Sequence, residues 1–284
     1  MGLEVTGRYR YPPPDAAWLA RRVEEIIEAD LPIIDAHHHL WVVAYADLTL
    51  GDRLDAVLDA HETAANGRLR GIRHSVSRDG NYSDGIGIRP APDGLLAHPQ
   101  YRTGLARLVA RGLSYDAMLY HSQLAELTAM ARTMSDLTIV LDHIGCILGI
   151  GPYRGHDAET FQHWRSAMAD LARCPNVIVK IGGFGMIICG ASWHDRLTPP
   201  ASVELARAWR PYADTCIELF GAERCMFESN FPVDKAMYSY RTLWNAFKLL
   251  TAEAIADEQT ALFSGTAAKA YRILLSASMD SAHA

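Results

Sequence analysis

The sequence has no long apolar run, no block of like charges and no repeat. No apolar stretch approaches the length of about 20 residues that a membrane-spanning helix needs, so we expect no membrane partner. The sequence has 27 lysine and arginine residues and 33 acidic residues, which gives a formal net charge of -6. The basic residues form no cluster in the sequence. That balance argues against nucleic acid as a partner and leaves small molecules as the expected ligands.

The sequence also lacks a C-x-x-C pair, and its five cysteines are odd in number. This pattern argues against a zinc ribbon and against a disulfide framework. It predicts reduced thiols in a cytoplasmic protein. The first 15 residues are polar and rich in proline, unlike a secretory leader, and we expect them to form an arm.

What the chain does have is 284 residues, 49% of them hydrophobic, in which short β-branched segments alternate with amphipathic ones. We expect about seven strands, at 33–37, 41–48, 70–74, 115–120, 137–142, 176–181 and 224–228. We expect helices at 16–28, 53–64, 101–111, 122–134, 156–173, 201–220, 237–250 and 257–274. The alternation predicts a parallel sheet covered by helices, in one domain over 16–275 followed by a frayed tail at 276–284.

Polar residues follow the expected strands, where parallel sheets bind their ligands. They are His37, His39, His74, His121, His143, Lys180 and Asn230. Because strand side chains alternate between faces, His37 and His39 point to the same side. Two adjacent imidazoles suit a divalent metal or a site that polarises a carbonyl, although an ordinary histidine-rich strand end is the alternative.

Two of these residues have an equally plain structural explanation. His121 either joins the site or caps the helix that it opens. Lys180 lies inside an expected strand, where it either binds a substrate carboxylate or pairs with a buried acid, and the pair is the safer interpretation.

Four motifs in order carry a resemblance to a known family. They are D-A-H-H-H-L-W at 35–41, G-I-R-H at 71–74, L-D-H-I-G at 141–145 and C-M-F-E-S-N-F-P-V-D-K at 225–235. With them the chain resembles the amidohydrolase superfamily, and more narrowly the amidohydrolase-related TIM-barrel hydrolases that include L-fuconolactonase and 2-pyrone-4,6-dicarboxylate lactonase. The resemblance spans about residues 15–275 and implies an α/β barrel that opens a cyclic ester or amide of a small polar or carboxylated substrate.

The resemblance also implies roles for individual residues. His37, His39 and His143 match histidines that hold a divalent metal, zinc or manganese, in many relatives, while some lactonases of the group work without one. Arg73 and His74 match a strand-end pair that would contact the substrate, and His121 sits where some relatives place a further ligand.

The chain departs from the family pattern at Asn230, where the superfamily carries an aspartate that binds metal and activates water. An asparagine is neutral and cannot take up a proton. Two acids could replace it: Glu228 lies two residues back on the same side of the strand, and Asp234 lies just past Pro232. For each of them a structural acid is the alternative.

A second departure concerns the barrel, because Trp41 and Tyr45 follow the first strand almost immediately. A parallel crossover needs a dozen or more residues, so about one strand–helix unit is missing after the first strand. The expected fold is therefore a TIM-barrel-like (β/α) barrel that is shortened or incomplete. An exposed edge would be covered by local rearrangement or by a homodimer.

These patterns favour a hydrolase in which His37, His39 and His143, with or without a metal, polarise a carbonyl. Glu228 or Asp234 would activate water, and Arg73, His74 and His121 would hold the substrate. The loops at 77–99 and 184–200 are the expected specificity loops. Two alternatives stay open: a metal-dependent decarboxylase of the same superfamily, and an inactive shortened remnant.

Overall fold

The sheet is parallel and its strands follow the order of the sequence. The computed structural model describes residues 12–36, 43–80 and 90–274. The strands are β1 (Val43–Tyr45), β2 (Gly71–Arg73), β3 (Ser114–Ala117), β4 (Ile139–Leu141), β5 (Val177–Ile181) and β6 (Cys225–Phe227). Within the described residues β1 and β6 each pair on one side only, so these six strands do not close into a barrel. This confirms the expected α/β fold, barrel-like and incomplete.

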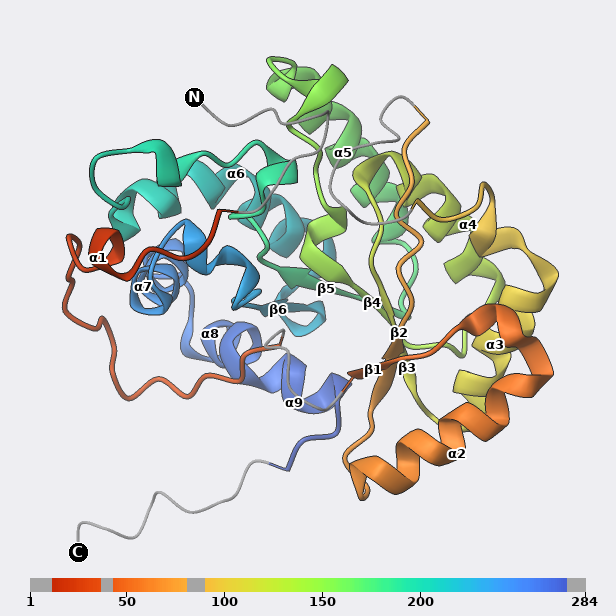
Figure 1. Ribbon diagram of the computed structural model, residues 1–284. Helices are drawn as coiled ribbons and strands as arrows, with labels where there is room; N and C mark the ends of the chain where they lie inside the picture. Colours follow the sequence, from red (N-terminus) through yellow and green to blue (C-terminus); the bar gives the residue numbers. More distant parts are fainter. Residues whose placement is uncertain (1–11, 37–42, 81–89, 275–284) are drawn as a thin grey trace, which may run out of the picture.

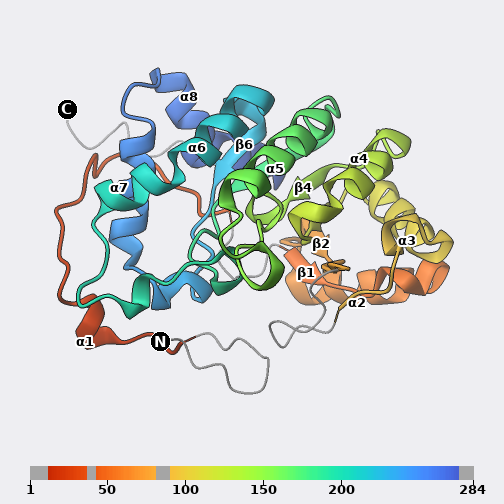
Figure 2. The same ribbon diagram turned by 90° about the horizontal axis from the view of Figure 1, so that it is seen from above.

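The helices cover the sheet in an arc. Figure 2 shows α7, α6, α5, α4, α3 and α2 following one another around the strands. Their bounds are α1 Ala16–Leu19, α2 Leu54–Ala65, α3 Pro99–Ala110, α4 Leu124–Thr133, α5 Asp157–Leu171, α6 Ser202–Phe220, α7 Tyr240–Leu250, α8 Ala256–Thr260 and α9 Thr266–Ala270. A π-helical turn at Ala261–Gly265 joins α8 to α9, so the expected helix at 257–274 is one nearly continuous element.

The two faces of the sheet bury different kinds of side chain. Alternate strand residues such as Ile72, Tyr115 and Val179 belong to the large apolar core that the outer helices share. On the other face Val140 and Met226 form a small cluster with Ala267 and Tyr271 of the C-terminal helical segment. This segment therefore covers part of the inner face. In a complete barrel, further strands would enclose that face.

A buried ionic cluster lies on that inner face, nearer the carboxyl ends of the strands. Lys180 Nζ is 2.7 Å from Asp116 Oδ2 and 2.9 Å from Asp142 Oδ1. Arg73 Nε lies 3.1 Å from Asp142 Oδ2, and the Tyr271 hydroxyl donates to Asp116 Oδ2 at 2.6 Å. Burial alone would lower the pKa of Lys180, but the two carboxylates raise it well above its ordinary value, which keeps the amine charged.

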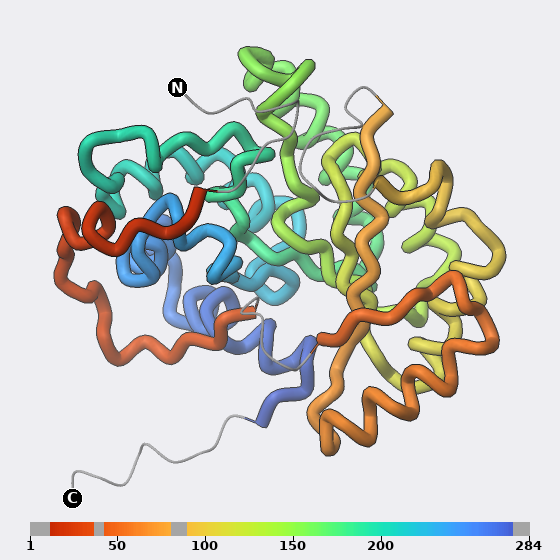
Figure 3. The backbone as a smooth tube through the Cα atoms, viewed as in Figure 1, coloured from red at the N-terminus to blue at the C-terminus, as the bar shows by residue number. Residues whose placement is uncertain are grey.

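The N-terminal segment differs from the prediction. Asp15 caps a helix as expected, but the helix spans only Ala16–Leu19 instead of 16–28. The chain beyond it runs alongside α7 (Figure 3), where the Asn245 side chain accepts from the Ile27 amide and Lys248 donates to the Ile27 and Glu28 carbonyls. These partners satisfy backbone groups that a helix would otherwise pair internally, which explains why the apolar stripe did not produce one.

The strand expected at 33–37 is also wrong over its described part. Residues 33–36 adopt no strand, although the Ile34 amide donates to the Phe263 carbonyl at 2.8 Å. The Asp35 carboxylate accepts from the Ser229 amide at 2.8 Å and from the Tyr240 hydroxyl at 3.1 Å. These bonds fix the segment just beyond the end of β6 without a ladder.

Two expectations from composition can be compared with the structure. All five cysteines are free thiols, and all but Cys189 are fully buried. In the part of the chain that is described, no helix is both long and apolar enough to cross a membrane.

The ionic cluster generates a stability prediction. Replacing Lys180 with methionine leaves two buried carboxylates without their shared cation, and we expect the free energy of unfolding to fall by about 3–5 kcal/mol. Urea denaturation at pH 7 measures it. The control is Lys235→Met at an exposed position, where we expect a change within about 0.5 kcal/mol. Equal, small effects of the two substitutions would contradict this account of the cluster.

Candidate functional site

The carboxyl ends of β4, β5 and β6 bring one histidine and one glutamate into contact. His143 follows β4 and Glu228 follows β6, and both are almost completely buried. Glu228 Oε1 lies 2.6 Å from His143 Nδ1 and accepts from the His143 amide at 3.1 Å. With Nδ1 as the donor, the neutral imidazole keeps its lone pair on Nε2. The carboxylate therefore fixes both the position and the tautomer of the ring.

The backbone at His143 is held in a conformation that side chains normally avoid. His143, Ile144 and Cys146 have φ angles of 54°, 50° and 37°, all in the left-handed region. The Trp164 indole donates to the Ile144 carbonyl at 2.8 Å, which helps to hold the turn. Such positions cost about 1–3 kcal/mol each, and they concentrate at functional sites.

Two consecutive glycines after β5 make room for this pair. A Cβ on Gly183, whose φ is 69°, would lie 2.8 Å from the His143 ring, and a Cβ on Gly182 would collide with the Glu228 side chain. The backbone of β5 thus passes directly against the histidine and the glutamate. Only glycine permits that approach.

The second candidate acid, Asp234, is engaged differently. Its Oδ1 accepts from Asn230 Nδ2 at 2.8 Å, and its Oδ2 accepts from the Tyr238 hydroxyl at 2.7 Å and the Gly185 amide at 2.9 Å. Burial raises the pKa of Asp234 to about 6 against the opposing effect of these donors. Asn230, itself at φ 54°, therefore acts as a donor to this carboxylate in the structure.

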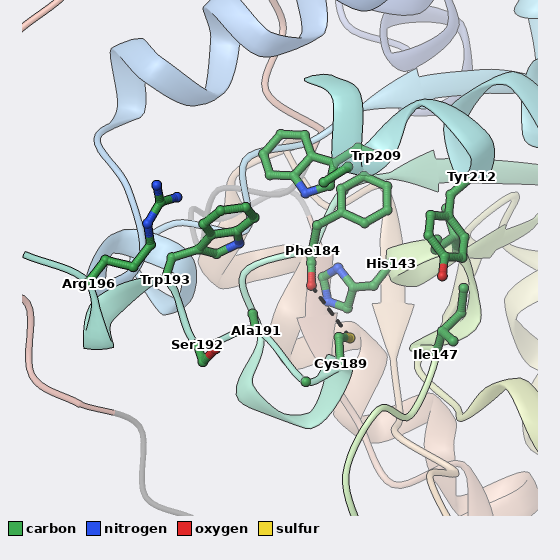
Figure 4. A pocket seen from close by; sticks show the side chains of 15 residues that line it. His143, Ile147, Phe184, Cys189, Ala191, Ser192, Trp193, Arg196, Trp209 and Tyr212 are labelled. Atoms are coloured by element: carbon green, nitrogen blue, oxygen red, sulfur yellow. Dashed lines mark hydrogen bonds between the residues drawn. The ribbon is translucent and has the colours of Figure 1, made fainter. Parts of the chain in front are cut away.

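A cavity of about 360 Å³ opens beside His143. Figure 4 shows the imidazole next to Phe184, with Trp193 and Tyr212 on opposite sides of the space. The β5–α6 loop and α6 supply most of the wall, and the turn after β4 supplies the rest. A buried imidazole of fixed tautomer beside such a cavity can take a proton from a water molecule or bind a cation.

The other predicted substrate contacts do not gather around this cavity. His74 is in aromatic contact with Tyr45 and Tyr101, and its Nδ1 accepts from the Leu48 amide at 3.1 Å. His121 accepts from the Leu148 amide at 3.3 Å, and burial lowers its pKa to about 4. Both histidines are therefore neutral rings with a backbone partner.

Arg73 and Lys180 belong to the ionic cluster on the inner face. Lys180 has the buried acids Asp116 and Asp142 as partners. Of the two alternatives from the sequence, a substrate carboxylate or a buried acid, the structure shows the buried acid. Asp142 and the neighbouring acids raise the pKa of Arg73 despite its burial. The Arg73 side chain remains about one quarter exposed, whereas the Lys180 side chain is buried.

The predicted metal ligands His37 and His39 lie outside the described residues. Asp35 is tied to the Ser229 amide, so the chain enters the D-A-H-H-H motif beside the end of β6. Among residues 12–36, 43–80 and 90–274 no three His, Cys, Asp or Glu side chains form a ligand cluster. His143 is nonetheless suited to a divalent ion, because a carboxylate on Nδ1 orients Nε2 as metal-binding histidines commonly require.

Several residues of the site were missed by the sequence analysis. Asp116 is an acid inside an expected buried strand, and that position was a signal that it needed a buried cation. Tyr271 contacts Asp116 from 155 positions away, which no local pattern reveals. The structure also places Trp209 both in the core and in the cavity wall.

Comparison with known sequences gives a family. The model of the Amidohydrolase family matches residues 42–273. An uncharacterized protein, y4mH, of Sinorhizobium fredii is 38% identical over 82% of this chain and 69% of its own length. An L-fucono-1,5-lactonase of Burkholderia multivorans is 26% identical over 82% of this chain and 71% of its own.

Solved structures agree on the fold. A crystal structure of an amidohydrolase from Burkholderia multivorans with bound zinc is 25% identical, covers 81% of this chain and 72% of that chain, and superposes with a TM-score of 0.64. A 2-pyrone-4,6-dicarboxylic acid hydrolase from Pseudomonas putida, described as putative, has a TM-score of 0.54 at 22% identity, over 78% and 68% of the two chains.

The burial of Asp234 generates a prediction for pH. The pKa of Asp234 is near 6 in the folded state, above the ordinary 3.8, so its protonated form stabilises the fold at low pH. This contribution to the free energy of unfolding is lost as the pH rises through 6. We expect this group to lower the free energy of unfolding by about 2.4 kcal/mol between pH 4 and 7. Urea midpoints across that range should lose this slope in Asp234→Asn and keep it in Asp257→Asn, at an exposed position. Parallel slopes in both variants would contradict the assignment.

Proposed function

The chain belongs to the amidohydrolase family and is a hydrolase, and we propose that it opens a cyclic ester by attack of water. His143, which lines the cavity and is held by Glu228, carries this proposal. A lactone has a more reactive carbonyl than an amide, so a site with one well-oriented base suits it. The relatives named L-fucono-1,5-lactonase support the same class of reaction.

In the proposed reaction His143 is the base and Glu228 is a positioning residue. Nε2 takes a proton from water while the water oxygen bonds to the acyl carbon, and Glu228 stabilises the resulting imidazolium through Nδ1. The bond from the acyl carbon to the ring oxygen then breaks. The proton on Nε2 passes to that oxygen, so that one lactone and one water give one hydroxy acid.

The remaining candidates receive narrower proposed roles. Asp234 and Asn230 hold the wall of the cavity through the Gly185 amide, and they act on the reaction only through that wall. Arg73 is the predicted substrate contact that retains both charge and exposure, but it pairs with Asp142 outside the lining of the cavity, so its contact with substrate stays a prediction. His74, His121 and Lys180 stabilise the scaffold around the site.

As an alternative to the metal-free reaction, we propose a divalent ion, zinc or manganese, held by His37, His39 and Nε2 of His143, which would then bind the ion in place of the proton. The amidohydrolase solved with bound zinc supports it, as does the anchoring of Asp35 beside β6. When bound, the ion would polarise the ester carbonyl and lower the pKa of water. The chain's own contribution is the carboxylate-held imidazole, which is present in either case.

The role of His143 can be tested by substitution. Asparagine tolerates the left-handed backbone at this position, so His143→Asn should fold while losing the base. We expect kcat/KM on a panel of δ-lactones, followed by acid release, to fall about 10²–10⁴-fold. His163→Asn, an exposed position on α5, is the matched control and should keep full activity. Unchanged turnover in His143→Asn would remove the residue from the mechanism.

The metal can be tested without an activity assay. We expect untagged protein, purified without chelator, to contain about one equivalent of zinc or manganese per chain by elemental analysis. His39→Ala should lose it, and His163→Ala should retain it. A metal content that the His39 substitution leaves unchanged would show that the ion lies elsewhere, and none in the unaltered protein would make the proposed chemistry metal-free.

A further inference from the structure

The cavity beside His143 has aromatic walls. Phe184 stacks on Trp209 with ring centroids 5.0 Å apart and planes 17° apart, and Tyr212 lies against Phe184 at 6.2 Å. Trp193 stands on the opposite side from Tyr212 in Figure 4. Ile144 and Ile147 complete an apolar lining around the imidazole. Such a surface binds flat, apolar groups through contact area and ring–ring geometry.

The cationic side chain of the described lining is already paired, and Ser192 and the Tyr212 hydroxyl are among its neutral polar groups. Arg196 is its cationic side chain, and its Nη2 already lies 2.8 Å from Glu204 Oε1 while its guanidinium sits over the Trp193 ring at 5.3 Å. Glu204 therefore already balances the charge of Arg196, which weakens its attraction for a substrate carboxylate. A sugar ring would bury several hydroxyls against aromatic carbon, which costs free energy unless each finds a partner.

The aromatic wall is fixed in place by the N-terminal segment. The Trp18 indole donates to the Arg196 carbonyl at 2.8 Å, and Arg21 donates to the Leu197 carbonyl at 2.9 Å. Both bonds hold the loop that carries Trp193 against the body of the protein. A preorganised wall loses less conformational entropy on binding than a free loop would.

From this lining we propose that the substrates are neutral cyclic esters that carry or are fused to an aromatic ring. The ring would occupy the space between Trp193 and Tyr212 against Phe184, with the ester carbonyl toward His143. The proposal rests on the lactone-opening function above and names its substrate class. It departs from the small polar or carboxylated substrates that the sequence led us to expect.

Three δ-lactones with alkoxide leaving groups test this directly. They are isochroman-3-one, which is benzo-fused, δ-valerolactone, which is unsubstituted, and D-glucono-1,5-lactone, which is polyhydroxylated. For each lactone, kcat/KM is divided by the rate constant of its hydroxide-catalysed opening. We expect this normalised kcat/KM to be about tenfold higher for isochroman-3-one than for δ-valerolactone. We expect it to be about 100-fold higher for isochroman-3-one than for the gluconolactone. Equal or reversed preference would overturn the proposal.

Variants of the wall separate specificity from folding. Trp193→Ala should lower the isochroman-3-one to δ-valerolactone ratio about tenfold, chiefly through KM, and Trp193→Phe should restore most of it. Leu197→Ala is the control, because that side chain is on the same loop but 86% exposed and outside the lining. A ratio that Trp193→Ala leaves intact would contradict the placement of the aromatic ring.

A binding experiment distinguishes failure of this proposal from failure of the hydrolase proposal. Titration calorimetry with 2-tetralone and with cyclohexanone, two ketones that water cannot open, measures the aromatic preference without catalysis. We expect 2-tetralone to bind at least about tenfold more tightly, and Trp193→Ala to abolish the difference. That result without turnover of any lactone would support the aromatic site and overturn lactone hydrolysis. Equal binding of the two ketones would overturn the aromatic site itself.

Discussion

The charged amine of Lys180 constrains the whole inner face of this protein. It bridges Asp116 on β3 and Asp142 at the end of β4 from its own place on β5, so one buried cation ties three neighbouring strands at one depth. Removing ions from water is costly, and such a cluster persists only where further groups complete it. Arg73 and Tyr271 do so here, and Tyr271 comes from the helical end of the chain. The cluster thus joins the C-terminal segment to a sheet whose described strands do not close.

The geometry of the site depends on that cluster. Asp142 is held by Lys180 and Arg73, and the chain turns into the left-handed region at the next residue, His143. Glu228 and the glycines after β5 then leave the imidazole little freedom. A site whose groups are fixed by buried neighbours avoids the cost of organising them at each turnover.

The sequence predicts the regular part of this structure and the residues at its strand ends, because both follow from local periodicity. It fails where a partner distant in the sequence decides the outcome. Val23 and Ile26 continue a helical stripe, yet Asn245 and Lys248 bind the nearby backbone in a non-helical form. The pairing of His143 with Glu228 spans 85 positions, and the role of Phe184 and Trp193 as a wall has no periodic pattern. Three consecutive histidines were conspicuous in the sequence, but they lie outside the described residues.

The different roles of the neighbouring acids Glu228 and Asp234 explain the asparagine at position 230. Glu228 orients the histidine, and Asp234 takes three donors, one of them Asn230 itself. An aspartate at 230 would set two carboxylates together in a buried space, which like-charge repulsion disfavours. Asp234 in turn holds Gly185, two residues from the glycine that touches His143. One loop after β5 therefore contacts the proposed base and also carries the aromatic wall. Substitutions in that loop should affect catalysis and substrate choice together.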